Sequence, residues 1–265
     1  MRNKAFFCTI LLSGTLALGA CGSRDGDANA KVQPNPVGSG SRIRDVVDPS
    51  KNLAGSTVNI SGAVVLTIDD YDETADGKSR GTVYVQDIAS QAPYSGASLY
   101  SPSFVPSNLR VVPGDTLDLL GQYVVESSIG SAKFNPGEGL AQISKPTATF
   151  RYEYETPAPL VINPNDLSAY STGFQWENML VTVNDVTMVD GVVGDGKGRV
   201  TGHFTSDSTT NAEAPTITNE LMPIAAGSIV AGTKYKSITG IVSWFFNFHI
   251  APRSSADFVP ATPGS

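Results

Sequence analysis

Three carboxylates in one short, turn-rich segment are the residues of this sequence best suited to metal binding. Asp70, Asp72 and Asp76 lie just before Gly77, and carboxylate oxygens are the ligands that Ca²⁺ prefers. The segment is not an EF-hand, because aligning Gly77 with the loop's sixth position puts Val83 where the bidentate glutamate belongs. Two interpretations stay open: a Ca²⁺ site formed by the three aspartates, and a solvated hairpin loop without a cofactor, which the sequence favours.

Residues suited to catalysis are few. The chain has two histidines, His203 and His249, and a lone histidine on a strand is more often structural or solvated than catalytic. The segment from Gly194 to Gly198 is rich in glycine, but no helix is expected behind it to bind a phosphate, so it is predicted to be a hairpin turn. His-Glu-x-x-His, Gly-x-Ser-x-Gly and Walker motifs do not occur after the first twenty residues. The sequence therefore predicts a protein that is not an enzyme, with a metal-dependent hydrolase as the alternative.

Aromatic side chains are the candidates for ligand contact. Trp244, Phe246 and Phe248 belong to a run of rings near the end of the chain, and strand alternation cannot bury every ring of that run. Tyr84 and Gln86 alternate with valines in the first half and are expected to face outward. The alternative is that the aromatic run covers a barrel core or packs two domains together. The sequence favours that alternative, because large aromatic rings more often pack than stack on ligands.

The first twenty residues have the pattern of an export signal. Arg2 and Lys4 precede a short apolar run, and small residues then lead to Cys21. The segment from Leu18 to Cys21 resembles the lipobox of bacterial lipoproteins. That resemblance implies cleavage before Cys21 and acylation of Cys21, with palmitate among the acyl groups. Because each buried methylene contributes about 0.8 kcal/mol, two or more chains anchor a protein durably in a membrane. An ordinary cleaved signal peptide is the alternative.

A lipid anchor places the expected protein in the cell envelope. In lipoproteins of enteric bacteria an aspartate after the modified cysteine favours inner-membrane retention, and Gly22 is not an aspartate, so the outer membrane is the predicted location.

Cys8 and Cys21 are the only cysteines, and Cys8 lies in the leader, so no intramolecular disulfide is expected. The net charge of −7 at pH 7 argues against nonspecific nucleic-acid binding.

The rest of the chain predicts an all-β protein. Residues 21–41 are rich in Gly, Ser, Asn, Asp and Pro and are predicted to form a flexible tether after the signal peptide at 1–20. A long first strand is expected at Thr57 to Ile68, bent or bulged at Gly62. The other predicted strands are 81–87, 116–126, 142–144, 179–189, 199–205, 235–243 and 246–250.

The two halves share landmarks. Asp76-Gly77-Lys78 recurs as Asp195-Gly196-Lys197, and Gly114 recurs as Gly232, at a nearly constant separation of about 119 residues that indicates duplication. Each half is predicted to be an OB-like, partly open, five-stranded Greek-key barrel, with a seven-stranded sandwich as the competing fold. The predicted domains span 42–150 and 158–260, with a boundary in the proline-rich segment 148–164.

Short segments in both halves are similar to the OB-type domains found beside secreted bacterial nucleases and in envelope lipoproteins. Asn178 stands where these domains usually have a glycine. The similar segments are 43–45, 81–87, 112–115, 176–181, 237–241 and 250–257. These segments are structural, so the resemblance informs the fold more than the function.

Together these features predict a non-enzymatic binding or assembly module anchored in the envelope by its lipid. The expected partners, after the membrane itself, are an envelope protein, then a glycan, then single-stranded nucleic acid. The acidity of the chain makes the last the weakest expectation. A single-stranded nucleic-acid-binding accessory of a secreted nuclease is therefore the alternative among binding functions.

Overall fold

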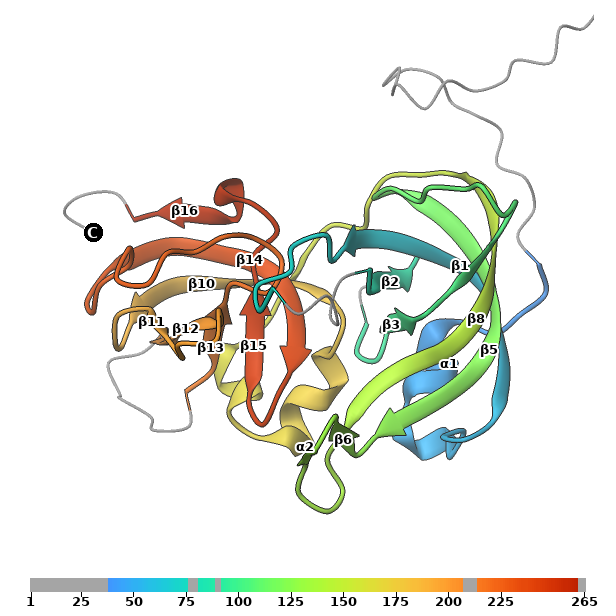
Figure 1. The fold of residues 1–265 in the computed structure, drawn as a ribbon, viewed down its shortest axis with the longest axis horizontal. Helices are drawn as coiled ribbons and strands as arrows, with labels where there is room; N and C mark the ends of the chain where they lie inside the picture. Colours follow the sequence, from blue (N-terminus) through green and yellow to red (C-terminus); the bar gives the residue numbers. More distant parts are fainter. Residues whose placement is uncertain (1–37, 76–80, 89–91, 207–213, 262–265) are drawn as a thin grey trace, which may run out of the picture. The chain divides into compact units, whose positions relative to one another are not determined.

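Five strands in the first half of the chain close into a barrel in the computed structural model (Figure 1). These strands are β1 (Thr57–Ile68), β2 (Val83–Asp87), β3 (Gly96–Tyr100), β5 (Asp115–Glu126) and β8 (Leu140–Glu153). They pair in the cyclic order β1-β2-β3-β8-β5, and only the contact between β3 and β8 is parallel. We call this unit the first barrel.

The structure describes residues 38–75, 81–88, 92–206 and 214–261, which are mostly β. Cys21, Asp76 and most of the predicted tether lie outside these ranges. Residues 38–41 are an exception, because they lie against the first barrel. The Gly38 N–H donates to Asp118 at 2.6 Å, and Ser41 forms a β-bridge with Ile60. No helix within the described ranges is long and apolar enough to span a membrane.

The long first strand is bulged as expected. Gly62 has φ +78°, and the pairing of β1 with β5 shifts register between Ser61 and Ala63. A bulge bends and twists a strand. This bend lets β1 pair with β5 along its first part and with β2 along its second part, which closes the barrel.

Five strands in the second half pair in the same cyclic order. They are β10 (Leu180–Met188), β12 (Val200–Thr205), β13 (Thr216–Thr218), β14 (Lys234–Trp244) and β15 (Phe248–Ala251). The order is β10-β12-β13-β15-β14, and the contact between β13 and β15 is again the parallel one. We call this unit the second circuit.

Equivalent glycines support the duplication. Gly114 and Gly232 both have positive φ, +97° and +80°, just before β5 and β14. Gly121 and Gly240 lie within these strands, where an added Cβ would stand 2.9 Å and 2.7 Å from an isoleucine of the neighbouring strand. Two positions in each half thus carry the same steric requirement.

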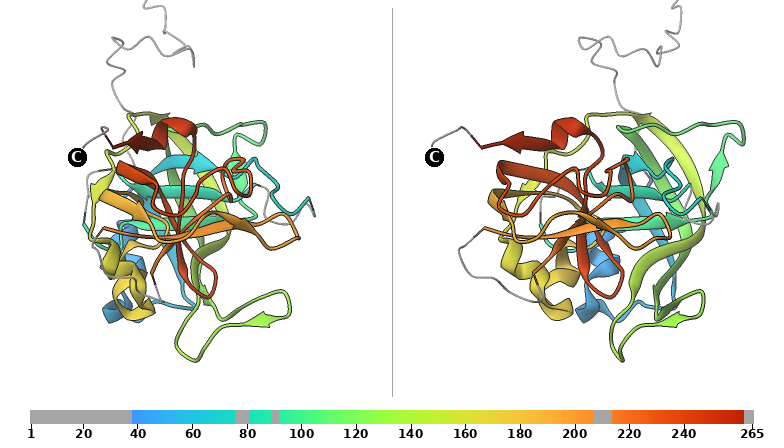
Figure 2. Two further views of the ribbon diagram at one scale, coloured as in Figure 1. Left: turned by 90° about the vertical axis from the view of Figure 1, so that its left-hand side faces the viewer. Right: turned by 60° about the vertical axis from the view of Figure 1, so that its left-hand side comes forward.

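Short elements complete the fold. The helix α1 begins at Ile43, and the Asp87 carboxylate accepts the N–H groups of Ile43 and Arg44 at 2.8 Å and 3.1 Å. The hairpin of β6 and β7 lies at one end of β5 and β8 (Figure 2). The short elements are α1 (Ile43–Val47), η1 (Pro49–Lys51), β4 (Ser103–Val105), β6 (Ser128–Ile129), β7 (Ala132–Lys133), β9 (Leu160–Val161), η2 (Pro164–Ser168), α2 (Tyr170–Gly173), η3 (Phe174–Trp176), β11 (Val193–Gly194), η4 (Ser255–Asp257) and β16 (Phe258–Pro260).

One hydrophobic core runs through both halves. Leu117 and Ile143 contribute to it from the first barrel, and Phe204 and Phe248 contribute from the second circuit. The two halves therefore pack on each other through a shared interior. The predicted boundary segment 148–164 begins inside β8 and includes β9, which pairs with β10.

Candidate functional site

Tyr84 and Gln86 do not face solvent, which corrects the expectation from the sequence. Tyr84 is 5% exposed and its hydroxyl donates to Glu220 Oε1 at 2.6 Å. Gln86 is fully buried, and its Oε1 accepts the Leu180 N–H at 3.0 Å. The outward face of β2 is covered because the second half of the chain packs against it. Neither side chain is available to an external ligand.

The tight turn at Asn178 belongs to this same contact. Asn178 adopts φ +63°, and asparagine tolerates this left-handed region better than most residues do. Its Nδ2 donates to the Ala141 carbonyl at 2.8 Å. A Cβ at Gly96 would lie 2.6 Å from the Asn178 carbonyl carbon, so the two halves approach here backbone to backbone.

Glu177, the preceding residue, is a buried carboxyl. It accepts the Ala141 N–H at 3.2 Å, and burial raises its pKa well above the usual value, although this hydrogen bond opposes the rise. The direction of this pKa shift favours the neutral acid form of the Glu177 side chain. A neutral carboxyl is far less costly to bury than a carboxylate.

Trp244 and Phe248 are buried too, which excludes them as stacking surfaces. Their ring centroids are 4.6 Å apart, and the Trp244 ring is 4.9 Å from Tyr170 and 6.3 Å from Phe134. Phe134 comes from the first half. Both rings are therefore packed in the interior, and Trp244 contacts the first half through Phe134.

Phe246 differs from its neighbours. It is 48% exposed at the turn between β14 and β15, with φ +61°. Its ring meets Phe134 edge-on at 5.0 Å and Phe245 at 5.1 Å. Of the aromatic candidates predicted from the sequence, Phe246 is the one that remains accessible.

Four polar residues form a row across the second circuit. His203 pairs with Thr216, Thr216 pairs with His249, and His249 pairs with Ser243 on four adjacent strands. The chain neighbours of His249 are buried in the core, so alternation directs this row to the outer face. Thr216 and Ser243 are buried beneath neighbouring groups, whereas the His203 side chain is 38% exposed. The accessible end of the row is His203.

Asp190 orients the His203 ring. Its Oδ2 lies 2.7 Å from His203 Nδ1, and its Oδ1 accepts the His203 N–H at 2.6 Å. A carboxylate on Nδ1 holds the proton there and leaves Nε2 as the acceptor of the neutral ring. Among the described residues, Nε2 has no hydrogen-bond partner. His203 can therefore accept a hydrogen bond from a ligand.

His249 is held in place on both sides. Its Nε2–H donates to the Phe245 carbonyl at 3.3 Å, and Nδ1 then accepts the Thr216 hydroxyl. Burial lowers the pKa of His249, and Arg199 and His203 lower it further against the opposing effect of Glu220. The Nδ1 lone pair of the neutral His249 ring is directed at the hydroxyl of buried Thr216, and the Nε2–H group is directed at the Phe245 carbonyl.

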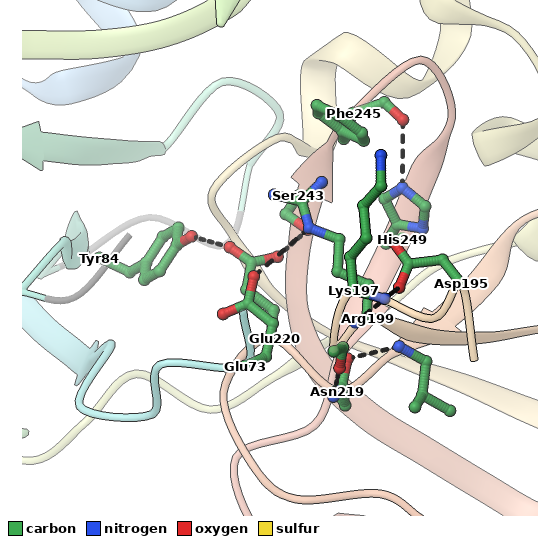
Figure 3. A network of polar contacts seen from close by, with 12 residues as sticks. Glu73, Tyr84, Asp195, Lys197, Arg199, Asn219, Glu220, Ser243, Phe245 and His249 are labelled. Atoms are coloured by element: carbon green, nitrogen blue, oxygen red, sulfur yellow. Dashed lines mark hydrogen bonds and ion pairs between the residues drawn. The ribbon is translucent and has the colours of Figure 1, made fainter. Parts of the chain in front are cut away.

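Carboxylates link the outer face to the first barrel (Figure 3). Glu220 accepts hydrogen bonds from Tyr84 at 2.6 Å and from Ser243 at 2.7 Å. Glu73 lies 3.5 Å from Arg199 Nε, and the guanidinium of Arg199 stands 4.2 Å above the centre of the Phe245 ring. A cation over an aromatic face is a stabilising arrangement, so this contact restricts the positions of the Arg199 and Phe245 side chains.

The turn that carries Arg199 is a hairpin turn, as the sequence predicts. The Asp195 side chain accepts the N–H groups of Lys197 at 2.7 Å and Arg199 at 3.1 Å. Gly198 has φ +105°, and a Cβ on it would lie 1.9 Å from the Glu73 carbonyl oxygen. The loop from Asp69 to Ala75 thus lies directly on this turn.

Asp69 is the most isolated carboxyl of the loop. It is fully buried, and neither of its oxygens has a hydrogen-bond partner of good geometry among the described residues. Burial raises the pKa of Asp69 to about 8, with further contributions from Glu220 and Glu73, and the backbone N–H of Tyr71 works in the opposite direction.

The predicted calcium ligands are not brought together by the described residues. Asp70 is exposed, Asp72 is half-buried and Asp76 lies outside the described ranges. Within those ranges no group of three or more His, Cys, Asp or Glu side chains is arranged to hold a metal ion. Calcium binding by this loop stays a prediction.

Sequence reasoning missed Arg199, Glu220 and Asp190 as members of the site. Tyr84 and Glu220 are separated by 136 residues, and no local pattern marks such a pair. No family model, curated protein or solved structure matches the chain.

Proposed function

We propose that the protein is a lipoprotein of the bacterial cell envelope that binds a protein or glycan partner and does not catalyse a reaction. Two OB-like units follow the segment after Cys21, and acylated Cys21 anchors the chain, with the outer membrane as its location. The cyclic strand order with one parallel contact, present in both halves, supports the OB-like interpretation.

The binding surface that we assign is the outer face of the second circuit around Arg199, His203, Phe245 and Phe246. OB-folds bind oligosaccharides and oligonucleotides on the second and third strands and on the loops after the first and fourth strands. In the second circuit these elements carry an exposed ring at Phe246, a cation stacked on Phe245 and an oriented imidazole at His203. The exposure of Phe246 is the observation that carries the proposal.

Binding is favoured over catalysis because the hydroxyls of the row are buried. His249 has partners on both ring nitrogens, and the hydroxyls of Thr216 and Ser243 are hydrogen-bonded to His249 and Glu220. Both hydroxyls belong to buried residues, so neither is presented to an external substrate as a nucleophile.

The fixed charges favour a ligand without phosphate groups. Asp190, Asp195 and Glu220 lie on or beside the face, and Arg199 is already paired with Glu73. Carboxylates repel a polyphosphate chain. An envelope glycan or an envelope protein therefore fits this face better than single-stranded nucleic acid.

The test is retention of envelope components by the purified protein and by two variants. Phe246→Ala should weaken retention of the bound glycan or protein about tenfold, since ring stacking contributes on the order of 1–3 kcal/mol. Tyr154→Ala is the matched control, because Tyr154 is an equally exposed ring of the first half. Equal binding by all three proteins would contradict the assignment. Tight binding of a single-stranded oligonucleotide that weakens steeply with salt would favour the nuclease-accessory alternative.

A further inference from the structure

Gly38 is fixed to the outer wall of the first barrel. Asp118 alternates along β5 with the core residues Leu117 and Leu119, so its side chain points outward. Its Oδ2 accepts the Gly38 N–H at 2.6 Å and lies 2.7 Å from a guanidinium nitrogen of Arg151 on β8. The place where the N-terminal part of the chain joins the fold is therefore defined by two strands of the barrel.

Two tyrosines lie beside this attachment, at the C-terminal end of β8. Tyr152 is half-buried and Tyr154 is 55% exposed. Their ring centroids are 6.4 Å apart in an edge-on arrangement. Burial raises the pKa of the Tyr152 hydroxyl, and the charges of Arg42 and Asp118 act on that pKa as well. The pair therefore stands close to the carboxylate that holds Gly38.

The turn before β5 adds an apolar residue to this end of the barrel. The Tyr154 N–H donates to the Gly114 carbonyl at 2.8 Å, and a Cβ on Gly114 would lie 2.5 Å from the Tyr154 carbonyl oxygen. Val112, two residues before this glycine, is 42% exposed. We call Tyr152, Tyr154 and Val112 the tyrosine patch.

The tyrosine patch lies far from the binding surface around Phe246. The strand β8 begins at Leu140, next to the β6–β7 hairpin, and its 14 residues extend over about 40 Å. Phe246 contacts Phe134, which lies at the hairpin end of this strand. Figures 1 and 2 show the turn between β14 and β15 at the opposite end of the fold from the C-terminal end of β8.

We propose that the first barrel rests on the lipid head groups of the membrane through the tyrosine patch, and that the anchored protein thereby presents Phe246 away from the bilayer. The inference rests on the proposed anchor at Cys21, which brings the membrane to the protein. Tyrosine suits this position because its ring is apolar and its hydroxyl stays hydrogen-bonded at the level of the head groups.

The length of chain between the anchor and the barrel allows this contact. Gly38 follows Cys21 by 38 − 21 = 17 positions, which span at most about 60 Å. A domain of this size has a radius of gyration of about 17 Å, and the attachment at Asp118 lies at the same end of the barrel as the patch. A contact of weak intrinsic affinity then becomes intramolecular, at an effective concentration of about millimolar.

The charges beside the patch select the kind of head group. Glu153 and Glu155 flank Tyr154 along the chain, whereas the Arg151 guanidinium is paired with Asp118. Carboxylates repel anionic lipids and attract the ammonium group of a zwitterionic head group. The patch therefore fits a bilayer of phosphatidylethanolamine and phosphatidylcholine better than one rich in phosphatidylglycerol.

The experiment uses residues 21–265 coupled through Cys21, the single thiol of that range, to a maleimide-bearing lipid in zwitterionic vesicles. The vesicles contain a lipid with a nitroxide quencher on its head group. Tyr154→Trp should lose about half or more of its added tryptophan emission, because the ring lies at the head-group level. Phe246→Trp is the matched control at an exposed ring of the opposite end and should lose no more than the wild type, whose two tryptophans give the background.

Two further measurements sharpen the result. Val112→Trp is a second reporter on the patch and should be quenched as Tyr154→Trp is, which keeps the test valid if one variant does not fold. Replacing the zwitterionic lipids with phosphatidylglycerol should reduce the quenching of both reporters.

Equal quenching at positions 154 and 246, or stronger quenching at 246, would overturn the proposal. Because the lipid is attached chemically, either result concerns the orientation alone. Natural acylation of Cys21 is tested separately, by membrane fractionation of the Cys21→Ser variant, so failure of the anchor and failure of the membrane contact are distinguishable.

Discussion

The first barrel and the second circuit share a strand order, but the outward face of the second strand is covered in the first barrel and accessible in the second circuit. In the first barrel the outward residues of β2, Tyr84 and Gln86, are buried against the second half of the chain. In the second circuit the outward residue His203 of β12 is partly exposed and is oriented by Asp190. One face has become an internal interface and the other remains open.

The difference shows how two units with the same strand order can differ in which face is accessible. Covering the β2 face of the first barrel packs Tyr84 with Leu180 and Ile241 in a cluster separate from the main core and leaves that face closed to a ligand. The cost is a set of buried carboxyls at the interface, Asp69 and Glu177, whose pKa values are raised by burial.

The largest expected effect concerns the proposed lipid anchor at Cys21, which precedes both halves in the sequence. Cys21→Ser should reduce the membrane-bound fraction from nearly all of the protein to background, because the acyl chains supply most of the membrane affinity. Membrane fractionation measures this, with processing sensitivity to globomycin as the second readout. An unchanged membrane-bound fraction in the variant would contradict the lipoprotein proposal. It would not affect the comparison between the covered face of the first barrel and the open face of the second circuit.

The second prediction contrasts a ring of the interface with the ring of the open face. Trp244→Ala should destabilise the protein by about 3–5 kcal/mol, because it removes a large buried side chain. Phe246→Ala should change the free energy of unfolding far less, by roughly 1 kcal/mol or below, since nearly half of that ring is already in solvent. Urea unfolding of both variants gives the two free energies of unfolding. Similar losses of stability in the two variants would contradict the distinction between a buried interface ring and an exposed ring.

A matched pair of glycines tests the contact between the loop and the second circuit. Gly198→Ala should cost about 1–3 kcal/mol more than Gly196→Ala. Both positions have positive φ, but an added Cβ meets the Glu73 backbone at Gly198 and open space at Gly196. Thermal unfolding of the two variants isolates the steric part. Equal destabilisation would mean that the loop does not rest on this turn.

Much of the fold could be predicted because its signals are local. Alternating β-branched residues located the long strands, and Gly62 and the Asp195 turn located a bulge and a hairpin. Burial of Tyr84 could not be predicted this way, since an outward position on an isolated barrel and an interface position have the same alternation.

The candidate site was predicted only in part for the same reason. Phe246 belongs to a run of rings that sequence alone cannot sort into buried and exposed members. Its exposure depends on the turn at φ +61° and on Phe134 from the other half. Arg199 and Glu220 enter the site through partners far away in the sequence, so no spacing rule identifies them.

Chemical modification of the two histidines tests the central claim most directly. Diethylpyrocarbonate should acylate His203 in the free protein and leave His249 unmodified, because the His203 Nε2 has no described partner whereas both nitrogens of His249 are hydrogen-bonded. When the retained glycan or envelope protein is bound at saturation, the rate of His203 modification should fall at least tenfold. A rate at His203 that is the same with and without the bound partner would show that the ligand does not occupy the outer face of the second circuit.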